Sequence, residues 1–354
     1  MAYQRERAFQ RKSRFLILFI ALLLIIGGGA VYYGWTGLQP VEIEKGKEKI
    51  VVIPPNSSTR AVGKILEENK LIRSAGMFGL YAKLKGIGSQ IKAGKYKLTV
   101  GETTDAIILT LTKGEIYKDT YQVTIPEGYT VEQIADRLAN KGLVNKNRFL
   151  QEVDKGTFTE DIVKGIPADP RIKHRLEGYL FPDTYEFEKG MTEHQIIDEM
   201  LQQTEKVWKT EWDVKFKQHH LSIHQALTLA SIVEREVRVD KERPEVAEVF
   251  YNRLAKGMPL QADATLQYVF KKQKQRVTFS DLKLDSPYNT YKIKGLPPGP
   301  IANPGEPSID AVANPQMSHF LYYVAKQDGT GEHYFAVTFS DHLKNITKSR
   351  HNQK

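Results

Sequence analysis

The chain has 354 residues and a formal net charge of +9, with 41% hydrophobic and 26% charged residues. This length exceeds that of one typical domain, and the composition excludes a disordered, collagen-like or multi-span membrane protein. There are no cysteines, so disulfides, thiolate metal sites and a cysteine nucleophile are excluded. The first 14 residues contain five basic residues and one acidic residue, so they carry about +4 of the charge and leave only a mild basic bias elsewhere.

An uncharged stretch runs from Phe15 to Trp35, and its first twelve residues, FLILFIALLLII, are all apolar. As a helix it would be about 30 Å long, enough to cross a bilayer core. The preceding basic residues predict a cytoplasmic segment 1–14, a transmembrane anchor 15–35 and an extracytoplasmic remainder. A cleaved signal peptide is the alternative, because its basic, apolar and small-residue order also fits. The bulky VYYGW after GGGA favours the anchor. Either interpretation makes an anionic cell-wall polymer a more natural partner than nucleic acid.

Residues 36–48 are polar, lack periodicity and predict a linker. An internal repeat follows at an offset of 72 residues, in which VIPPNSSTRAVGKILEENKLI (52–72) matches TIPEGYTVEQIADRLANKGLV (124–144). Each copy predicts an apolar strand, a proline-containing turn, a hydroxyl-rich helix start and an amphipathic helix. Between the copies, residues 92–98 predict a strand and residues 106–115 a helix. We therefore expect a small α+β unit, present twice.

The pattern changes beyond residue 175, where a polar helix is predicted around 193–208 and a strongly apolar helix from Ile223. The segment SPYNTYKIKGLPPGPIANPG (286–305) is too rich in Pro and Gly for a long helix or central strand, and it predicts an ordered surface loop. Such long loops often carry function. The runs in FLYYVAKQDGTGEHYFAVTF (320–339) predict a β-hairpin around the glycines.

The apolar helix carries the sharpest chemical signal. SIHQ is a capping-box pattern with Ser222 at the N-cap and Gln225 at N3, and it fixes the helical frame. At about 100° per residue, Glu234 falls inside the apolar face, whereas Arg235 and Arg238 lie on the polar side and Glu236 at an edge. Apolar surroundings disfavour the charged form, so we expect a raised pKa for Glu234, as a general acid needs. A partly exposed Glu234, or one paired with Arg238, is the structural alternative.

Other candidates are weaker. Three histidines lie near the start of the apolar helix, namely His219, His220 and His224. Their spacing is not that of a metal site and favours a solvated polar face. We therefore expect no metal and no cofactor. Asp263, in PLQADAT, is either a second carboxylate or a helix cap. The tyrosines of the 286–305 segment and of the hairpin either pack or stack on sugar rings.

Five motifs in order carry a resemblance to a known family: LEGYLFPDTY (176–185), LASIVEREV (229–237), VFYNRLAKGMPLQADAT (249–265), SPYNTYKIKGLPPGPIANPG (286–305) and LYYVAKQDG (321–329). Over roughly residues 49–348 the chain resembles the MltG/YceG-like endolytic murein transglycosylases. The resemblance implies a single N-terminal transmembrane helix, a small LysM-like α+β unit (49–118) and a larger mixed α+β YceG-like catalytic domain (119–348).

The family's activity implies cleavage of nascent peptidoglycan strands between N-acetylmuramic acid and N-acetylglucosamine, with 1,6-anhydromuramic ends. Its catalytic glutamate maps onto Glu234, which would act as general acid and then as base. Its groove motifs imply substrate contacts from a set of polar and aromatic residues: Gln261, Asp263, Thr265, Tyr288, Asn289, Thr290 and Tyr291. Ala264 departs from the family, because many members have proline at this position. The resemblance therefore does not define the geometry of the local turn.

The expected protein is thus a lyase of cell-wall biogenesis in the cell membrane, with penicillin-binding proteins of the synthesis complex as partners by resemblance. Two alternatives belong to other classes. One is a non-catalytic wall-binding or scaffold protein, and the other is a muramidase-type hydrolase that admits water and uses Asp263 as its second carboxylate.

Overall fold

The computed structural model describes residues 20–29, 32–114, 116–270, 274 and 277–352. The predicted basic segment 1–14 and part of the predicted anchor lie outside these ranges. The chain divides into two compact units, Met1–Asp119 and Thr120–Lys354. Among the described residues, one helix, Ile20–Gly37, is long and apolar enough to cross a membrane or to be a signal sequence.

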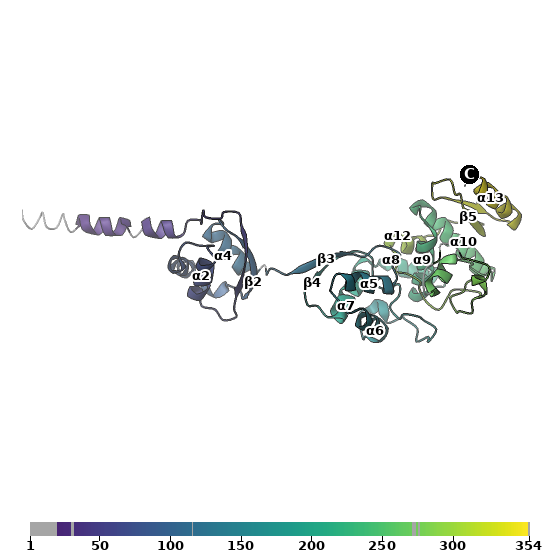
Figure 1. The fold of residues 1–354 in the computed structure, drawn as a ribbon, viewed down its shortest axis with the longest axis horizontal. Helices are drawn as coiled ribbons and strands as arrows, with labels where there is room; N and C mark the ends of the chain where they lie inside the picture. Colours follow the sequence, from purple (N-terminus) through teal and green to yellow (C-terminus); the bar gives the residue numbers. More distant parts are fainter. Residues whose placement is uncertain (1–19, 30–31, 115, 271–273, 275–276, 353–354) are drawn as a thin grey trace, which may run out of the picture. The chain divides into compact units, whose positions relative to one another are not determined.

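The fold is mixed α+β, as predicted, and its described strands pair into three two-stranded antiparallel sheets (Figure 1). The first unit contains β1 (Glu48–Ile53), α2 (Thr59–Glu68), α3 (Ala75–Leu84), β2 (Gly94–Thr99) and α4 (Thr104–Lys113). The second begins with β3 (Thr120–Thr124), α5 (Val131–Asn140), α6 (Lys146–Lys155), β4 (Thr184–Glu188), α7 (Glu193–Val207) and α8 (Thr210–Gln218). It continues with α9 (Ile223–Glu236), α10 (Arg243–Ala255), α11 (Asp263–Val269), α12 (Glu306–Ala313), β5 (Tyr322–Ala325), β6 (His333–Ala336) and α13 (Phe339–Asn352).

The predicted repeat is confirmed at the level of individual caps. Ser58 caps α2 by accepting from the Ala61 N–H, and Thr130, 72 residues later, caps α5 by accepting from the Gln133 N–H. Each cap satisfies a backbone donor that the first helical turn leaves unpaired. The matched apolar residues Leu66 and Leu138 are both fully buried. Strand, turn and capped helix therefore recur as the sequence predicts.

The structure extends the repeat beyond the residues that the sequence matched. In each copy a second helix follows, α3 or α6, and the copy closes with an antiparallel strand pair, β1 with β2 or β3 with β4. Phe78 of α3 and Phe149 of α6 are both fully buried, each in the core of its own unit. Both copies are thus β-α-α-β units, and in the second copy a longer segment precedes the last strand.

The predictions for α7, α9 and the C-terminal β5–β6 hairpin are also confirmed. The segment 286–305 contains no helix of four or more residues and no strand, as predicted, but the expectation of a surface loop is wrong. Residues 288–290, 297 and 299–305 are buried. Their backbone is satisfied inside the unit, since Ser231 accepts from the Ile301 N–H at 3.0 Å and the Tyr129 carbonyl accepts from the Asn303 N–H at 2.9 Å. Such partners allow irregular backbone to be buried.

Candidate functional site

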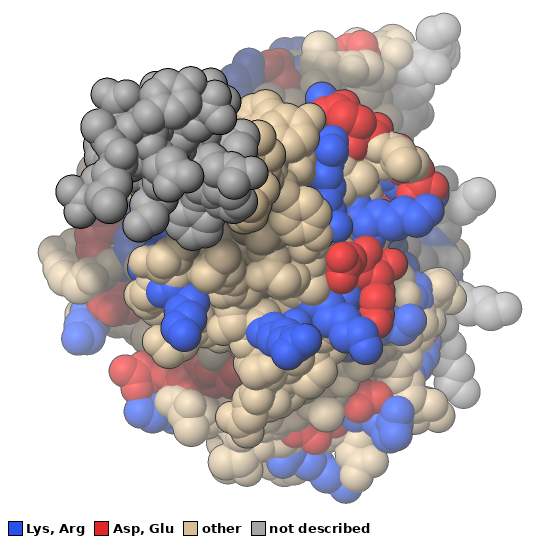
Figure 2. Space-filling view, turned by 90° about the vertical axis from the view of Figure 1, so that its left-hand side faces the viewer, with Lys and Arg blue, Asp and Glu red and all other residues tan. Residues whose placement is uncertain are grey.

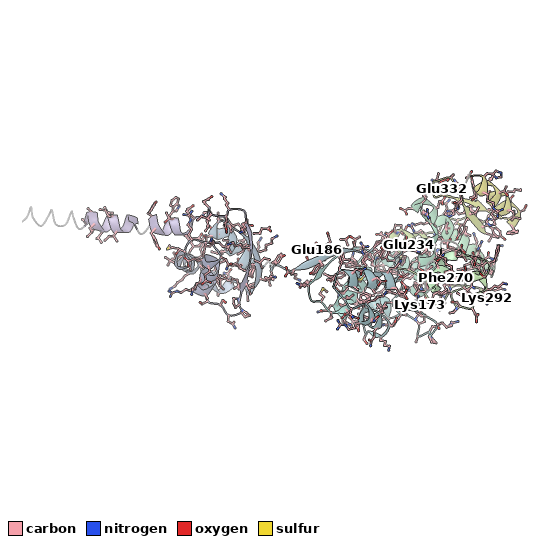
Figure 3. All side chains as sticks on the ribbon, viewed as in Figure 1. Lys173, Glu186, Glu234, Phe270, Lys292 and Glu332 are labelled. Carbon is pink, nitrogen blue, oxygen red and sulfur yellow. The ribbon has the colours of Figure 1, made fainter. Side chains whose placement is uncertain are left out.

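Helix α9 brings two carboxyl groups to one end of the second unit's core. Its N-terminus has the predicted capping box, in which Ser222 and Gln225 satisfy each other's backbone N–H groups. Every residue from Ala226 to Val233 is buried, so the helix is held in the core of the unit. Glu234 and Glu236 follow at the C-terminal end, and Figure 3 shows Glu234 within the helical part of this unit. Two positions apart on a helix, the two side chains point about 200° apart.

The carboxyl group of Glu234 is buried, as predicted, with its side chain 6% exposed. Its surroundings, however, are polar rather than apolar, which corrects the sequence analysis. Oε2 accepts hydrogen bonds from the Gly305 N–H at 3.1 Å and from Ser308 Oγ at 2.8 Å, and Oε1 lies 3.3 Å from Arg243 Nη1. Arg243 also donates to Ser308 Oγ. Periodicity along α9 cannot reveal these partners, because they come from α10 and the start of α12.

A further carboxyl group, that of Glu127, lies beside this cluster. Its side chain occupies the space that a Cβ at Gly305 would take. Burial raises the pKa of Glu127, and the nearby charge of Glu234 raises it further. The turn of the second repeat copy therefore contributes an acid to the cluster, which the sequence analysis did not identify.

Glu236 has a different environment, although the helical pattern places it only at an edge. Its carboxylate accepts hydrogen bonds from the Ala264 N–H at 3.3 Å and from the Tyr323 hydroxyl at 3.2 Å. Burial of the carboxyl group raises its pKa to about 7, and the nearby charge of Asp263 acts in the same direction. A carboxyl group with a pKa near 7 can both give and take a proton at neutral pH. Its partners come from α11 and the hairpin.

Two cavities lie near the C-terminal end of α9. The larger, of about 470 Å³, is lined by Glu236, Arg238 and the hairpin connection, including Glu332 and His333. The smaller, of about 120 Å³, is lined by Ala264 and Arg235 together with residues of α5 and α11. Glu236 therefore lines the larger cavity, and Ala264, whose N–H donates to it, lines the smaller one. By contrast, Glu234 lines neither cavity.

Three of the predicted substrate contacts are accessible near Glu236. Gln261 and Asp263 are exposed, and the hydroxyl group of Tyr291 donates to Asp263 Oδ1 at 2.6 Å. The left-handed backbone of Gln261 (φ 52°) forms the turn before α11, and its N–H donates to the Thr290 carbonyl.

The other four are buried and bonded within the protein. Thr265 and Thr290 share a hydroxyl–hydroxyl hydrogen bond of 2.9 Å, and Thr290 also accepts from the Ala262 N–H. Asn289 donates to the Leu282 and Leu284 carbonyls, and Tyr288 accepts from the Lys173 N–H. The Thr265–Thr290 pair thus joins the 286–305 segment to α11, and this places Tyr291 beside Asp263.

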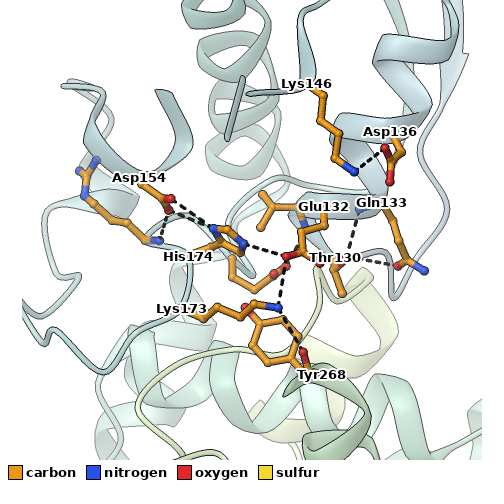
Figure 4. A network of polar contacts seen from close by, with 12 residues as sticks. Thr130, Glu132, Gln133, Asp136, Lys146, Asp154, Lys173, His174 and Tyr268 are labelled. Atoms are coloured by element: carbon orange, nitrogen blue, oxygen red, sulfur yellow. Dashed lines mark hydrogen bonds and ion pairs between the residues drawn. The ribbon is translucent and has the colours of Figure 1, made fainter. Parts of the chain in front are cut away.

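A polar network joins the second repeat copy to α11 (Figure 4). His174 contacts Asp154 at 3.2 Å through Nδ1 and Glu132 at 3.4 Å through Nε2, and Lys173 Nζ lies 3.2 Å from Glu132. Lys173 also donates to the Tyr268 carbonyl. Burial lowers the pKa of His174, but Asp154 and the other nearby carboxylates outweigh it and raise the pKa overall. The network therefore fixes one wall of the smaller cavity.

Glu177, in the motif LEGYLFPDTY, is another buried acid that the sequence analysis did not single out. Burial raises its pKa to about 7. It accepts hydrogen bonds from the Val131 N–H and from Asn303 Nδ2, at 3.0 and 3.2 Å. The next residue, Gly178, has a φ of 87°, and a Cβ there would lie 2.5 Å from Pro300. The first and fourth motifs are therefore packed together, which explains the glycine.

The helical pattern had no signal for Glu127, Glu177 or Arg243, because each acquires its role from contacts with distant segments. Glu236 had a weak signal, since it shares the end of α9 with Glu234. Of the three histidines at the start of α9, only His224 is buried, and it contacts the Tyr179 hydroxyl and the Pro298 carbonyl. Among the described residues, no group of three or more His, Asp or Glu side chains is arranged to hold a metal ion.

Comparisons with known proteins identify the family of the chain. The chain is 40% identical to the endolytic murein transglycosylase of Bacillus subtilis, over 90% of each chain. It is 34% identical to that of Streptococcus pneumoniae, over 94% of this chain and 65% of the relative. A crystal structure of a YceG-like protein from Listeria monocytogenes matches with a TM-score of 0.58 and 38% identity, over 84% of this chain and 99% of that one. The model of the YceG-like family matches residues 51–348, which hold the acids of α9 and all the segments that surround them, and the chain therefore belongs to the YceG-like family.

Proposed function

We propose that this protein is an endolytic peptidoglycan lytic transglycosylase, a lyase that cleaves the bond between N-acetylmuramic acid and N-acetylglucosamine in nascent glycan strands. The family and the names of the relatives support the reaction class. The observation that carries the proposal is the carboxyl group of Glu236, which has a pKa raised to about 7 and lines a cavity of about 470 Å³.

The chemistry needs one group that is first an acid and then a base. Protonated Glu236 gives its proton to the glycosidic oxygen while the bond from that oxygen to the muramic C1 breaks. The resulting carboxylate takes the proton of the sugar's C6 hydroxyl, whose oxygen bonds to C1 and closes the 1,6-anhydro ring. Water takes no part, and the carboxyl group returns to its starting form.

Asp263 and Tyr291 have complementary roles in this proposal. Positive charge develops at C1 as the bond breaks, and a nearby carboxylate stabilises it. Asp263 is exposed and held by the Tyr291 hydroxyl at 2.6 Å, so its position is defined before substrate binds. Gln261, Asp263 and Tyr291 are our proposed substrate contacts. Thr265, Tyr288, Asn289 and Thr290 are proposed as positioning residues, since their side chains are buried.

The sequence prediction assigned the acid to Glu234, and the contacts favour Glu236. Both carboxyl groups accept hydrogen bonds, but Glu234 also lies 3.3 Å from the charged guanidinium group of Arg243, whereas the donors to Glu236 are the neutral Ala264 N–H and Tyr323 hydroxyl. Glu236 borders a cavity large enough for sugar rings, whereas Glu234 borders neither of the two cavities near it. We therefore propose that Glu234 positions Arg243 and the start of α12, and that Glu236 reacts.

Location and partners follow from the same proposal. The helix Ile20–Gly37 would anchor the protein, with its N-terminus in the cytoplasm and the residues that follow the helix outside. Membrane-bound growing strands would then be within reach, and the polymerising penicillin-binding proteins that make them would be the partners.

The test is mass spectrometry of products from uncrosslinked glycan strands, using the full-length protein and the variants Glu236→Gln and Glu234→Gln. Anhydromuramic ends from the wild type and none from Glu236→Gln are the expected results. Loss of cleavage in Glu234→Gln alone, with an unchanged melting temperature, would return the acid role to Glu234. Reducing ends would indicate a hydrolase, and no cleavage by the wild type would favour a scaffold.

A further inference from the structure

Helix α3 of the first unit has an outer face without charge. Phe78 and Ala82 point into the core and are fully buried. Met77, Leu80 and Leu84 lie on the opposite side, within about 60° of one another around the helix. Leu80 is 50% exposed and Leu84 is 78% exposed. A helix that is apolar on both faces needs a second apolar environment.

The second repeat copy provides an internal control for this face. Helix α6 has the same length and an N-cap in the same place, Asn145 instead of Ser74, and it buries Phe149 and Val153 as α3 buries Phe78 and Ala82. Its outer positions are Arg148, Gln151 and Lys155, all exposed. The β-α-α-β unit therefore does not itself require an apolar outer face at these positions.

The outer face of α3 is continuous with the apolar N-terminal helix. Met77 packs against Gly34 and Gly37 of that helix, and a Cβ at Gly37 would lie only 2.7 Å from Met77 Cγ. Gly34 lies between Tyr33 and Trp35, which are exposed. Tyrosine and tryptophan at the end of a membrane helix mark the level of the lipid headgroups. The start of α3 is therefore at that level if the N-terminal helix spans the bilayer.

Two further hydrogen bonds hold the chain after the N-terminal helix against the first unit. Thr104 Oγ1 donates to the Leu38 carbonyl at 3.0 Å, and Arg73 Nε donates to the Pro40 carbonyl at 3.0 Å. Together with the Met77 contacts, they join the end of the N-terminal helix and the residues after it to the start of α3 and the start of α4. The linker predicted from the sequence at residues 36–48 is thus attached to the unit over its first residues, and the same face of the unit is kept next to the helix.

We propose that the outer face of α3, formed by Met77, Leu80 and Leu84, lies on the bilayer and inserts Leu80 and Leu84 among the lipid headgroups, while Met77 packs against the end of the N-terminal helix. The inference rests on the membrane anchoring proposed above. Figure 2, which looks at the molecule from the side of the N-terminal helix, shows an uncharged area with Lys and Arg side chains, and some Asp and Glu side chains, along its edge. Apolar residues flanked by basic ones are typical of helices that lie in the interface of membranes with anionic lipids. Exposed Arg73 and Lys83 flank the apolar face of α3.

The absence of cysteine allows a direct test on the full chain. Single-cysteine variants Leu84→Cys, Leu24→Cys and Val52→Cys are labelled with an environment-sensitive dye and reconstituted into vesicles of phosphatidylglycerol and phosphatidylcholine. Quenchers carried on the lipid headgroup and on the acyl chain report contact and depth. Leu24 lies in the N-terminal helix, and Val52 is an equally apolar, exposed residue of β1. Figure 1 shows the sheet of this unit on the side away from the N-terminal helix.

We expect the dye at residue 84 to be quenched by headgroup quenchers, the dye at 24 by acyl-chain quenchers, and the dye at 52 by neither. Quenching at 24 without quenching at 84 would overturn the α3 contact and leave the anchor intact. No quenching at 24 would overturn both. A blue-shifted dye at 84 that lipid quenchers do not reach would also overturn the proposal, because it would place α3 against a protein instead of lipid.

A matched variant adds a second measurement. Leu80→Gln with Leu84→Lys gives α3 the residues that α6 has at these positions, and both side chains are exposed, so the fold is retained. A dye at Lys83→Cys should lose most of its headgroup quenching in this background, whereas the dye at 24 should not change. Unchanged quenching at 83 would show that these leucines do not hold α3 on the bilayer.

Discussion

Helices α3 and α6 occupy the same place in two copies of one β-α-α-β unit and bury the same two positions. Their outer faces nevertheless differ, with Leu80 and Leu84 in the first copy replaced by Gln151 and Lys155 in the second. Because the fold is shared, the difference cannot be a requirement of the fold. The difference instead reflects the environment of each copy. The first copy follows the apolar N-terminal helix, and the second is followed by the segment that contains α9.

The helices before them differ in a complementary way. In α5 of the second copy, Glu132 is tied to Lys173 and His174 and lines the smaller cavity. The matching residue of α2, 72 positions earlier, is Arg60, and it is exposed. The duplicated unit thus supplies a wall of the smaller cavity in one copy and the proposed membrane-side surface in the other, through side chains outside the shared core.

The largest expected effect concerns the proposed acid, which lies in the second unit. Replacing Glu236 with Gln removes the proton that the leaving group needs, so cleavage should fall by about 10²–10⁴-fold or more. The first unit should not respond, and the dye at residue 84 should stay quenched. Initial rates and vesicle quenching on the same preparation check this. Loss of both properties together would show that the two units are not functionally separate.

The cores of the two copies should respond alike. Phe78→Ala and Phe149→Ala each leave a cavity in place of a fully buried ring and should each cost about 3–5 kcal/mol of unfolding free energy. Denaturant unfolding with a reporter in each unit measures both. A cost below about 1 kcal/mol in one copy only would break the equivalence of the two cores.

The pH dependence of cleavage should reflect the second unit alone. The pKa of Glu236 is raised to about 7, so its acid form is present below pH 7 and is lost as the pH rises through that value. Above it, kcat/KM should fall about tenfold per pH unit.

Glu177 also has a pKa raised to about 7, and its replacement by glutamine is the matched control. Glu177→Gln should leave the alkaline fall in place. If that variant abolishes the fall, the titrating group is Glu177 and the role assigned to Glu236 is wrong.

The smallest effect on stability is expected from the outer faces. Leu80→Gln with Leu84→Lys, and the reverse change Gln151→Leu with Lys155→Leu, alter exposed positions and should each change the unfolding free energy by about 0.5 kcal/mol or less. Calorimetry checks this value. The first variant should cleave detached glycan strands at the wild-type rate, since α3 is outside the site. A large destabilisation by the first variant would mean that these leucines pack within the protein.

Much of the architecture could be predicted from the sequence because it depends on local chemistry. The repeat was visible in the spacing of proline, hydroxyl and apolar residues, and the caps at Ser58, Thr130 and Ser222 formed as expected. Turn residues and alternating aromatic residues predicted the C-terminal hairpin. The burial of 286–305 could not be predicted, because its backbone partners, such as Ser231, lie far away in the chain.

By itself, the sequence determined the family, the duplicated unit, the apolar N-terminal helix and the position of two acidic residues at the end of α9, where we propose the acid, since caps, periodicity and ordered motifs are properties of neighbouring residues. Only the tertiary structure decided what each acid meets there. Glu234 meets Arg243 and Ser308, and Glu236 meets Tyr323 and a cavity. The physical reason is that periodicity shows which side of a helix faces inward, whereas pKa and reactivity depend on the donors, charges and space that other segments bring to that side.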